Sequence, residues 1–257
     1  MMQIPVTIRR VRDLRVFDVG DQSIVVACDS SGSIGPKPND TYAAPAATVA
    51  HFALRVALLE LLAAGSTPVL AVDALCVERD PTGAEMINAA RALLSDLGLD
   101  SEAALLGSTE DNVTTTSTGI GVTAIGIAPR GTLRMGSSQA DDLVVCLGEP
   151  LSAPAHDLYP GHPGVVTVAE VRRARNELGV HDALPVGSHG IRYEVGELAR
   201  EAGLTARLDP ACGLDLDCSG GPATCVLVSC YPPTLDALRA FRSDLPVTVV
   251  ATLRAAV

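Results

Sequence analysis

The sequence predicts an α/β or α+β protein with two lobes, in which strands and helices alternate along the whole chain. Hydrophobic residues make up 47% of the 257 residues but aromatic residues only 3%, so the core must consist mainly of aliphatic side chains, as in many α/β proteins. Short apolar runs alternate with segments of helical periodicity, and a polar segment at residues 128–142 interrupts them near the middle. We therefore expect two domains, at residues 1–130 and 140–257.

The first domain should begin with an apolar strand that ends at Asp29, directly before a loop rich in glycine and serine. The expected strands are residues 24–28, 69–77 and 119–127, and the expected helices are residues 45–64 and 83–97. Pro45 suits the first turn of the long helix, and Gly65 and Pro68 mark its end.

The second domain repeats the alternation. The expected strands are residues 143–147, 204–209, 224–230 and 246–253, and the expected helices are residues 168–179, 191–203 and 233–243. No internal repeat and no low-complexity tract interrupts this pattern.

The formal net charge of −11 disfavours a nucleic-acid-binding protein, which needs clustered cations to displace counterions from phosphates. We expect no membrane span, because the best apolar run, residues 56–64, contains Glu60 and is far shorter than the roughly 20 residues required. We expect no signal peptide either, because the N-terminal segment is charged early. The seven cysteines, an odd count, then indicate reduced thiols in the cytoplasm.

Four cysteines fall between residues 212 and 230, which raises the question of a zinc site. Their spacing does not match a C-x-x-C knuckle, and Cys225 and Cys230 would point to opposite faces of one strand. We expect these cysteines to be small buried hydrophobic residues.

Two acidic residues lie within apolar segments of the first domain. Glu60 belongs to a helix that is apolar on nearly every side, and Asp73 interrupts a run typical of a buried strand. Burying a carboxylate without a partner is costly. Each is therefore either paired with a group elsewhere in the fold or placed at a metal site.

The loop that follows Asp29 has the composition of an anion-binding loop. Gly32 and Gly35 allow main-chain N–H groups to approach an anion, and Ser33 adds a hydroxyl donor. Lys37 is the only lysine in the chain, which suggests a need for a compact ammonium group beside phosphate. The alternatives are that Asp29 caps a turn and that Lys37 remains by chance on a solvated loop.

The segment Gly107–Asn112, with the sequence GSTEDN, places Glu110 and Asp111 in a tight polar loop after an apolar strand. Adjacent carboxylates in such a loop suit Mg²⁺, which prefers oxygen ligands. The same residues are also typical of an exposed turn.

These motifs together resemble the superfamily that contains aminoimidazole ribonucleotide synthase, thiamine-monophosphate kinase and selenophosphate synthetase. The resemblance lies in CDSSGSIGPK, LLELLAAGSTP, AVDAL, GSTEDN and TGIGVTAIG in the first half, and DDLVVCLGE, SHGIRYEVGELAREAGL and SGGPATCVLVSC in the second. The family loop G-G-[DE]-T reads G-S-T-E here, so its acid is shifted by one position. The family motif S-D-G-G reads S-H-G-I, at Ser188–Ile191.

The resemblance implies an N-terminal domain, residues 1–130, that binds ATP and Mg²⁺ and forms a homodimer through a β-barrel-type interface, followed by an α/β C-terminal domain. For such a site we expect the metal ligands to be Asp29, Glu60, Asp73 and Glu110, and the nucleotide contacts to be Gly32, Ser33, Gly35, Lys37 and Thr109. We expect Asp111 or another acid to be the catalytic residue.

Among members of the superfamily, the α-ribazole kinases show the greatest similarity, through DSSGSIG and GSTEDN. This similarity implies a small-molecule kinase with a nucleoside-like substrate. Another kinase of the superfamily, an ATP-dependent synthase and a non-catalytic ATP-binding protein are the alternatives.

Overall fold

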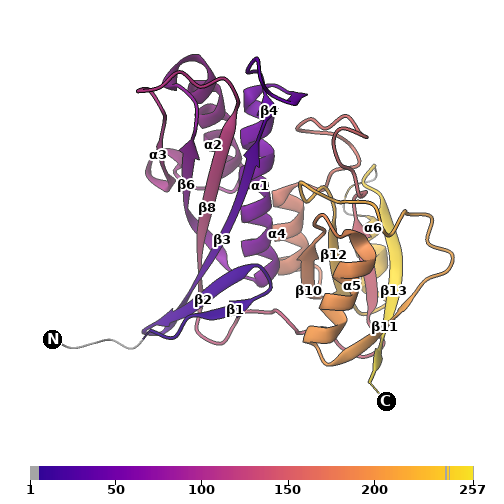
Figure 1. Cartoon of the computed structure of the whole chain (residues 1–257). Coiled ribbons are helices and arrows are strands. Elements are labelled where there is room, and N and C mark those ends of the chain that lie inside the picture. Colours follow the sequence, from indigo (N-terminus) through magenta and orange to yellow (C-terminus); the bar gives the residue numbers. More distant parts are fainter. Residues whose placement is uncertain (1–5, 241, 243, 257) are drawn as a thin grey trace. The chain divides into compact units, whose positions relative to one another are not determined.

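The computed structural model of the protein describes residues 6–240, 242 and 244–256, and the chain folds into two compact units (Figure 1). Unit 1 contains the residues up to Leu61 together with Ser66–Leu133. Unit 2 contains Leu62–Gly65 and the chain from Arg134 onward. The sequence placed the connection between these parts at residues 128–142.

Unit 1 is built on an open six-stranded sheet with the strand order β1-β2-β3-β8-β6-β7. Its strands are β1 (Arg9–Val11), β2 (Leu14–Val19), β3 (Gln22–Gly32), β6 (Thr67–Leu75), β7 (Leu105–Ser108) and β8 (Gly119–Pro129). β6 and β7 are parallel, and all other neighbours are antiparallel. Because β1 and β7 are free edges, the sheet does not close, and the barrel implied by the resemblance is not formed within this chain.

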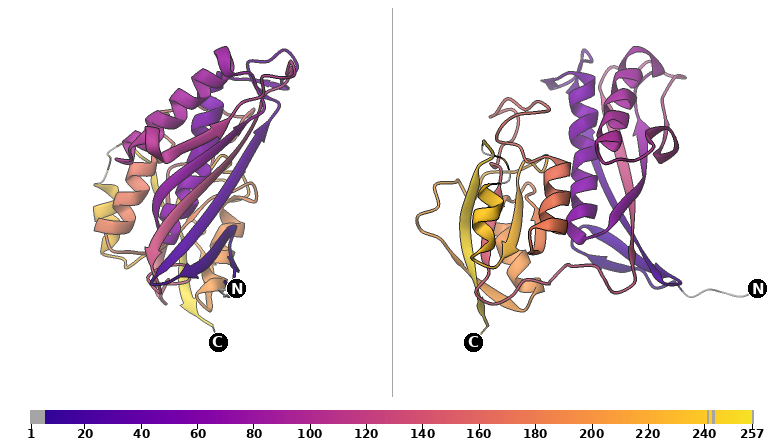
Figure 2. Two further views of the ribbon diagram at one scale, coloured as in Figure 1. Left: turned by 90° about the vertical axis from the view of Figure 1, so that its left-hand side faces the viewer. Right: turned by 180° about the vertical axis from the view of Figure 1, so that it is seen from behind.

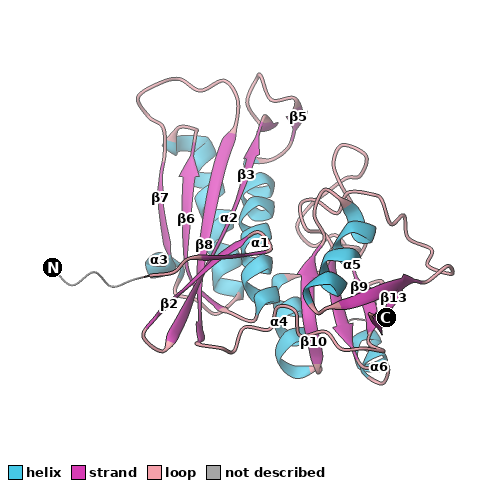
Figure 3. Ribbon diagram, turned by 60° about the horizontal axis from the view of Figure 1, so that its bottom comes forward, coloured by secondary structure: helices cyan, strands magenta, loops and turns pink. Residues whose placement is uncertain are grey.

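Two long helices of unit 1, α1 (Ala46–Ala64) and α2 (Ala84–Asp96), lie over the same face of this sheet (Figures 2 and 3). The strands alternate accordingly: in β8, every second residue from Ile120 to Ala128 is buried. A π-helical turn (Arg79–Gly83) precedes α2, and α3 (Ser101–Ala104) precedes β7. Two short parallel strands, β4 (Ile34–Gly35) and β5 (Tyr42–Ala43), lie in the loop after β3.

The helix α1 is long and apolar enough to cross a membrane by length and composition alone, but 72% of its most apolar window is buried inside the protein. Leu54, Leu58 and Leu61 are each at most 1% exposed. This burial is typical of the central helix of a folded domain.

The opposite face of the sheet in unit 1 is apolar and partly exposed. Its side chains include Ile24, Val26, Val72, Leu106, Ile125 and Ile127. Leu106 is 62% exposed and Ile127 is 36% exposed. We call this surface the open face.

Unit 2 contains a five-stranded antiparallel sheet with the order β10-β12-β9-β13-β11. Its elements are β9 (Leu143–Leu147), α4 (Val168–Glu177), β10 (Val180–Pro185), α5 (Gly190–Glu201), β11 (Leu204–Leu208), β12 (Val226–Cys230), α6 (Thr234–Arg239) and β13 (Val247–Ala255). Aliphatic side chains of α5, including Ile191 and Leu198, pack with Val144 and Leu227 in its core. Thr167 and Glu170 form a capping box that starts α4.

Several sequence-based predictions need correction. Asp29 does not end its strand, because β3 pairs with β8 along its whole length and continues to Gly32. The sequence did not predict β1, β2 or β10. The strand expected directly before Gly107 is β7, and it continues to Ser108. The helix expected at residues 233–243 is α6, and residues 241 and 243 lie outside the described part of the chain. Of the four cysteines expected to be buried, Cys225 and Cys230 are buried free thiols, whereas Cys212 and Cys218 are only partly buried.

Candidate functional site

Three polar loops of unit 1 meet at one end of the strands of the six-stranded sheet. β3 and β6 are both antiparallel to β8, which lies between them, and β7 is parallel to β6. The carboxyl ends of β3, β6 and β7 therefore lie at the same end of the sheet as the start of β8, at the top of unit 1 in Figure 3. We call residues 33–41 the first loop, residues 76–83 the second loop and residues 109–118 the third loop, and the three together the loop cluster.

The first loop is joined to the third by hydrogen bonds centred on Asp40. Its carboxylate accepts bonds from the main-chain N–H of Thr118 (2.7 Å), the Thr118 hydroxyl (2.7 Å) and the main-chain N–H of Lys37 (2.8 Å). Partial burial acts to raise the pKa of Asp40, but these bonds outweigh it and hold the pKa below its ordinary value. Ser33 donates its main-chain N–H to the carbonyl oxygen of Thr118 (2.9 Å).

Gly35 is required because the first loop passes close to Thr118 and Asp40 at this position. A Cβ atom at position 35 would lie 2.2 Å from Oγ1 of Thr118 and 2.8 Å from Oδ2 of Asp40. These distances are shorter than any non-bonded contact a side chain can make. The glycine that the sequence indicated for anion binding therefore also allows the loop to pack against Thr118.

Lys37 joins the first loop to the second through an ion pair with Glu78. The other carboxylate oxygen of Glu78 accepts a hydrogen bond from the Thr82 hydroxyl (2.6 Å). Partial burial acts to raise the pKa of Glu78, but the bonds from Lys37 and Thr82 lower it to about 2. Lys37 is mostly buried, with 14% of its side chain exposed.

The third loop is held to the second through Asp111 and Glu110. Asp111 accepts hydrogen bonds from the main-chain N–H of Arg79 (2.9 Å) and the Thr109 hydroxyl (2.7 Å). The bond from Arg79, followed by that from Thr109, lowers the pKa of Asp111. Glu110 donates its main-chain N–H to the carbonyl oxygen of Val77 (2.9 Å), and its carboxylate accepts from Asn112 (2.8 Å).

Asp29 and Asp73 lie deeper in unit 1, on the face of the sheet that the helices cover. Both pair with Val122 of β8, so they are two strands apart, about 10 Å between Cα atoms. Asp73 is 4% exposed, and Asp29 is half-buried. Burial raises the pKa of both carboxyl groups.

The structure does not gather the predicted metal ligands into one cluster. Glu60 lies on α1, Asp29 and Asp73 within strands, and Glu110 on the third loop. In the part of the chain that the structure describes, no three His, Cys, Asp or Glu side chains are placed to hold a metal ion. A metal held by ATP phosphates and one or two carboxylates needs no such cluster, so the carboxylates of the loop cluster suit Mg²⁺ delivered with a nucleotide.

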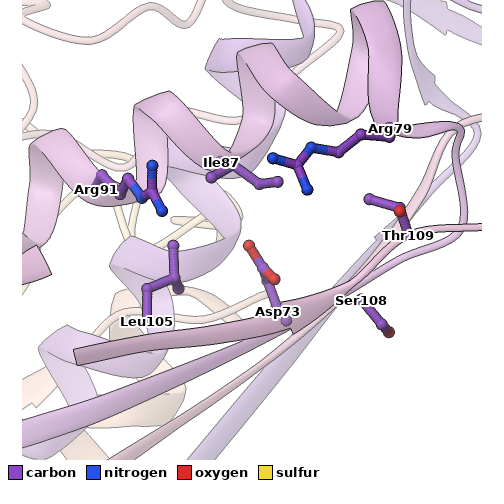
Figure 4. Close-up of a pocket in the computed structure, with 8 residues that line it drawn as sticks. Asp73, Arg79, Ile87, Arg91, Leu105, Ser108 and Thr109 are labelled. Atoms are coloured by element: carbon purple, nitrogen blue, oxygen red, sulfur yellow. The ribbon is translucent and has the colours of Figure 1, made fainter. Parts of the chain in front are cut away.

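The surroundings of Asp73 favour a role other than metal binding. Its side chain points into a cavity of about 210 Å³, which is also lined by Arg79 and Arg91 (Figure 4). Two guanidinium groups beside a single carboxylate oppose the entry of a divalent cation.

Sequence reasoning missed Asp40, Glu78, Arg79 and Thr118, which together hold the loop cluster in place. One signal was available: the only lysine of an acidic chain is expected to find a carboxylate, and Glu78 follows the strand that contains Asp73. The predicted nucleotide contacts Ser33, Gly35 and Lys37 do lie in one loop, close to the loop that carries Thr109. Gly32 is the last residue of β3 and pairs with Gly119.

No family model matches the sequence, and no curated protein matches it. Solved structures do match. Thiamine-monophosphate kinase from Stenotrophomonas maltophilia K279a has a TM-score of 0.65 at 17% identity, covering 99% of this chain and 90% of that one. A ThiL structure complexed with AMPPCP and TMP has a TM-score of 0.64 at 13% identity, covering 95% and 85%.

The PurL protein of Thermotoga maritima complexed with ADP matches with a TM-score of 0.64 at 16% identity, covering 94% of this chain but only 42% of PurL. This chain therefore spans nearly the whole of the thiamine-monophosphate kinases but less than half of PurL. At these identities, the comparisons establish the fold. The chain has the α+β architecture shared by thiamine-monophosphate kinase and PurL.

Proposed function

We propose that the protein is a cytoplasmic, ATP- and Mg²⁺-dependent kinase that phosphorylates a nucleoside-like alcohol, with the 5′-hydroxyl of α-ribazole as the first acceptor to test. The observation that carries the proposal is the loop cluster, in which the only lysine, a glycine-rich loop and several carboxylates meet at one end of the sheet. The fold adds support, because it matches thiamine-monophosphate kinases over nearly their full length.

In this proposal, the ammonium group of Lys37 and main-chain N–H groups of the first loop neutralise the phosphates of ATP. Phosphoryl transfer requires mainly positioning and charge neutralisation, because its transition state is loose. Glu110 and other carboxylates of unit 1 would hold Mg²⁺, with Asp29 and Glu60 as further candidates, and the ion would supply additional positive charge. Asp111 receives the acceptor proton late in the transfer, when a weak base is sufficient.

The homodimer belongs to the same proposal. The open face carries exposed aliphatic side chains, including Leu106 and Ile127, on a sheet whose other face is covered by α1 and α2. An exposed apolar surface of this kind is typical of an interface. A second copy of the chain is the natural partner, since the resemblance implies pairing through this domain. Replacing Ile125 with Asp should shift the mass measured by light scattering from dimer to monomer; a wild-type monomer would contradict the dimer.

The deciding experiment is a ³¹P NMR assay with ATP, Mg²⁺ and a panel of acceptors that includes α-ribazole and thiamine monophosphate. The proposed kinase yields ADP and a phosphoester with one acceptor. A synthase releases inorganic phosphate, and a non-catalytic ATP-binding protein gives no turnover; either outcome rejects the proposal. A phosphoester formed only from thiamine monophosphate would retain the kinase but replace α-ribazole as acceptor.

The role of Lys37 is tested in the same assay. Lys37→Met should raise the Kd for ATP at least about tenfold, equivalent to about 1.4 kcal/mol. Arg10→Met removes a cation from an exposed position, 71% exposed, in the same unit and serves as the control. Equal ATP affinity in wild type and Lys37→Met would remove the loop cluster from nucleotide binding.

A further inference from the structure

A cavity of about 210 Å³ lies between the sheet of unit 1 and the helix α2 (Figure 4). Asp73 enters it from β6, Leu105 and Gly107 from β7, and Ile87 and Arg91 from α2. A water molecule occupies about 30 Å³ in the liquid. The cavity therefore has room for much more than one bridging water.

The carboxylate of Asp73 is held in this cavity with part of its hydrogen-bonding capacity unused. Asp73 is 4% exposed, and its buried Oδ2 atom has no hydrogen-bond partner. The side chain lies over Gly107, the residue opposite it on β7: a Cβ atom at position 107 would be 1.5 Å from Oδ1 of Asp73. A buried acceptor without a partner costs free energy, which a bound donor would recover.

Two guanidinium groups lie around the same carboxylate (Figure 4). Arg91 is oriented by Glu102, to which its Nη2 donates a hydrogen bond of 2.7 Å, while its buried Nε has no partner. Arg79 lines the cavity from its more exposed end, and its main chain is fixed by the bond to Asp111. The cavity is therefore lined by one buried acceptor, Asp73, and two cationic donors, Arg79 and Arg91.

We propose that this cavity binds a small organic anion that also carries hydroxyl groups, such as a sugar phosphate. Its anionic group pairs with Arg79 and Arg91, because guanidinium groups match phosphate and carboxylate oxygens. A hydroxyl group of the ligand donates to Oδ2 of Asp73. A bare anion lacks the hydroxyl donors and is repelled by the carboxylate, and a divalent cation is repelled by the guanidinium groups.

The test is isothermal titration of the full chain, without ATP, using three probes: ribose 5-phosphate, ribose and inorganic phosphate. Ribose 5-phosphate should bind at least about tenfold more tightly than either of the others, because it alone engages both ends of the site. Equal affinity for ribose 5-phosphate and inorganic phosphate would overturn the proposal by showing surface anion binding only. The absence of heat with ribose 5-phosphate would also overturn it.

Two substitutions locate the binding. Ile87→Phe fills the cavity and should weaken ribose 5-phosphate binding at least about tenfold. Asn88→Phe places the same side chain on the exposed side of α2 and should leave binding unchanged. Equal affinities in these two variants would place the ligand outside the cavity.

Asp73→Asn separates a binding role from a structural one. A carboxylate kept for a ligand can be neutralised without loss of stability in the ligand-free protein. Asp73→Asn should therefore keep or raise the midpoint of thermal unfolding while losing the affinity for ribose 5-phosphate. A lower midpoint with unchanged affinity would contradict the proposal. Because no step involves ATP, this result is independent of the kinase assay.

Discussion

Replacing Asp40 with alanine tests whether this residue holds the loop cluster together. The substitution removes three hydrogen bonds of 2.7–2.8 Å. Two of them come from Thr118, which is 2% exposed, so water cannot readily replace them. Each buried donor left without a partner costs about 1–2 kcal/mol, so Asp40→Ala should destabilise the protein by about 2–4 kcal/mol.

The loss should appear as a lower midpoint in urea unfolding, with the slope unchanged. Asp13→Ala, at a position 87% exposed, is the control and should stay within about 0.5 kcal/mol of wild type. A double-mutant cycle with Thr118→Val isolates the hydroxyl contact, and we expect a coupling energy of about 1 kcal/mol. If Asp40→Ala unfolds like the control, or if the two changes are additive, the contact does not support the loop cluster.

Three further predictions concern single residues. Gly35→Ala should destabilise unit 1 by about 1–3 kcal/mol because its Cβ has no space; Gly32→Ala, where a Cβ meets nothing within 4 Å, is the control in thermal unfolding. The pKa of Glu78 is about 2 when folded and 4.5 ordinarily, so its stabilising contribution is complete above pH 4.5 and is lost as the pH falls toward 2. The stability difference between wild type and Glu78→Gln should shrink over that range, and a constant difference would refute the assignment. Asp142 is fully buried, and its carboxylate accepts 2.8 Å bonds from His181 and from the main-chain N–H of Gln139. Asp142→Ala should therefore cost about 3 kcal/mol in urea unfolding; a loss below about 0.5 kcal/mol would contradict it.

The sequence allowed the prediction of most elements because their signals are local. The helix α1 ends at Ala64, directly before Gly65, and β9 is the uninterrupted run LVVCL. In contrast, β10 has the sequence VHDALP, in which a histidine, an aspartate and a proline hide the strand. Its Asp182 is fully buried because it accepts a bond from Gly136 (2.8 Å), a residue far away in the sequence. Contacts of that kind cannot be read from periodicity.

The candidate site shows the same limit. Composition singled out the first and third loops as parts of a candidate site. Their proximity depends on β8 lying between β3 and β6, which is a non-local arrangement. For the same reason, Asp73 was recognised as a buried acid, whereas its neighbours Arg79 and Arg91 were not. Charge pairs across strands and helices follow from topology, which local sequence patterns do not encode.

The pairing of Lys37 with Glu78 has a consequence for any anion that reaches the first loop. Such an anion does not meet a bare ammonium group; it must replace a carboxylate that is already bound. The gain in electrostatic energy is therefore the difference between two contacts, the one made with the anion and the one lost with Glu78. Affinity at this position then depends as much on how readily Glu78 turns away as on the lysine itself, and a change at residue 78 can tighten anion binding without adding a new contact.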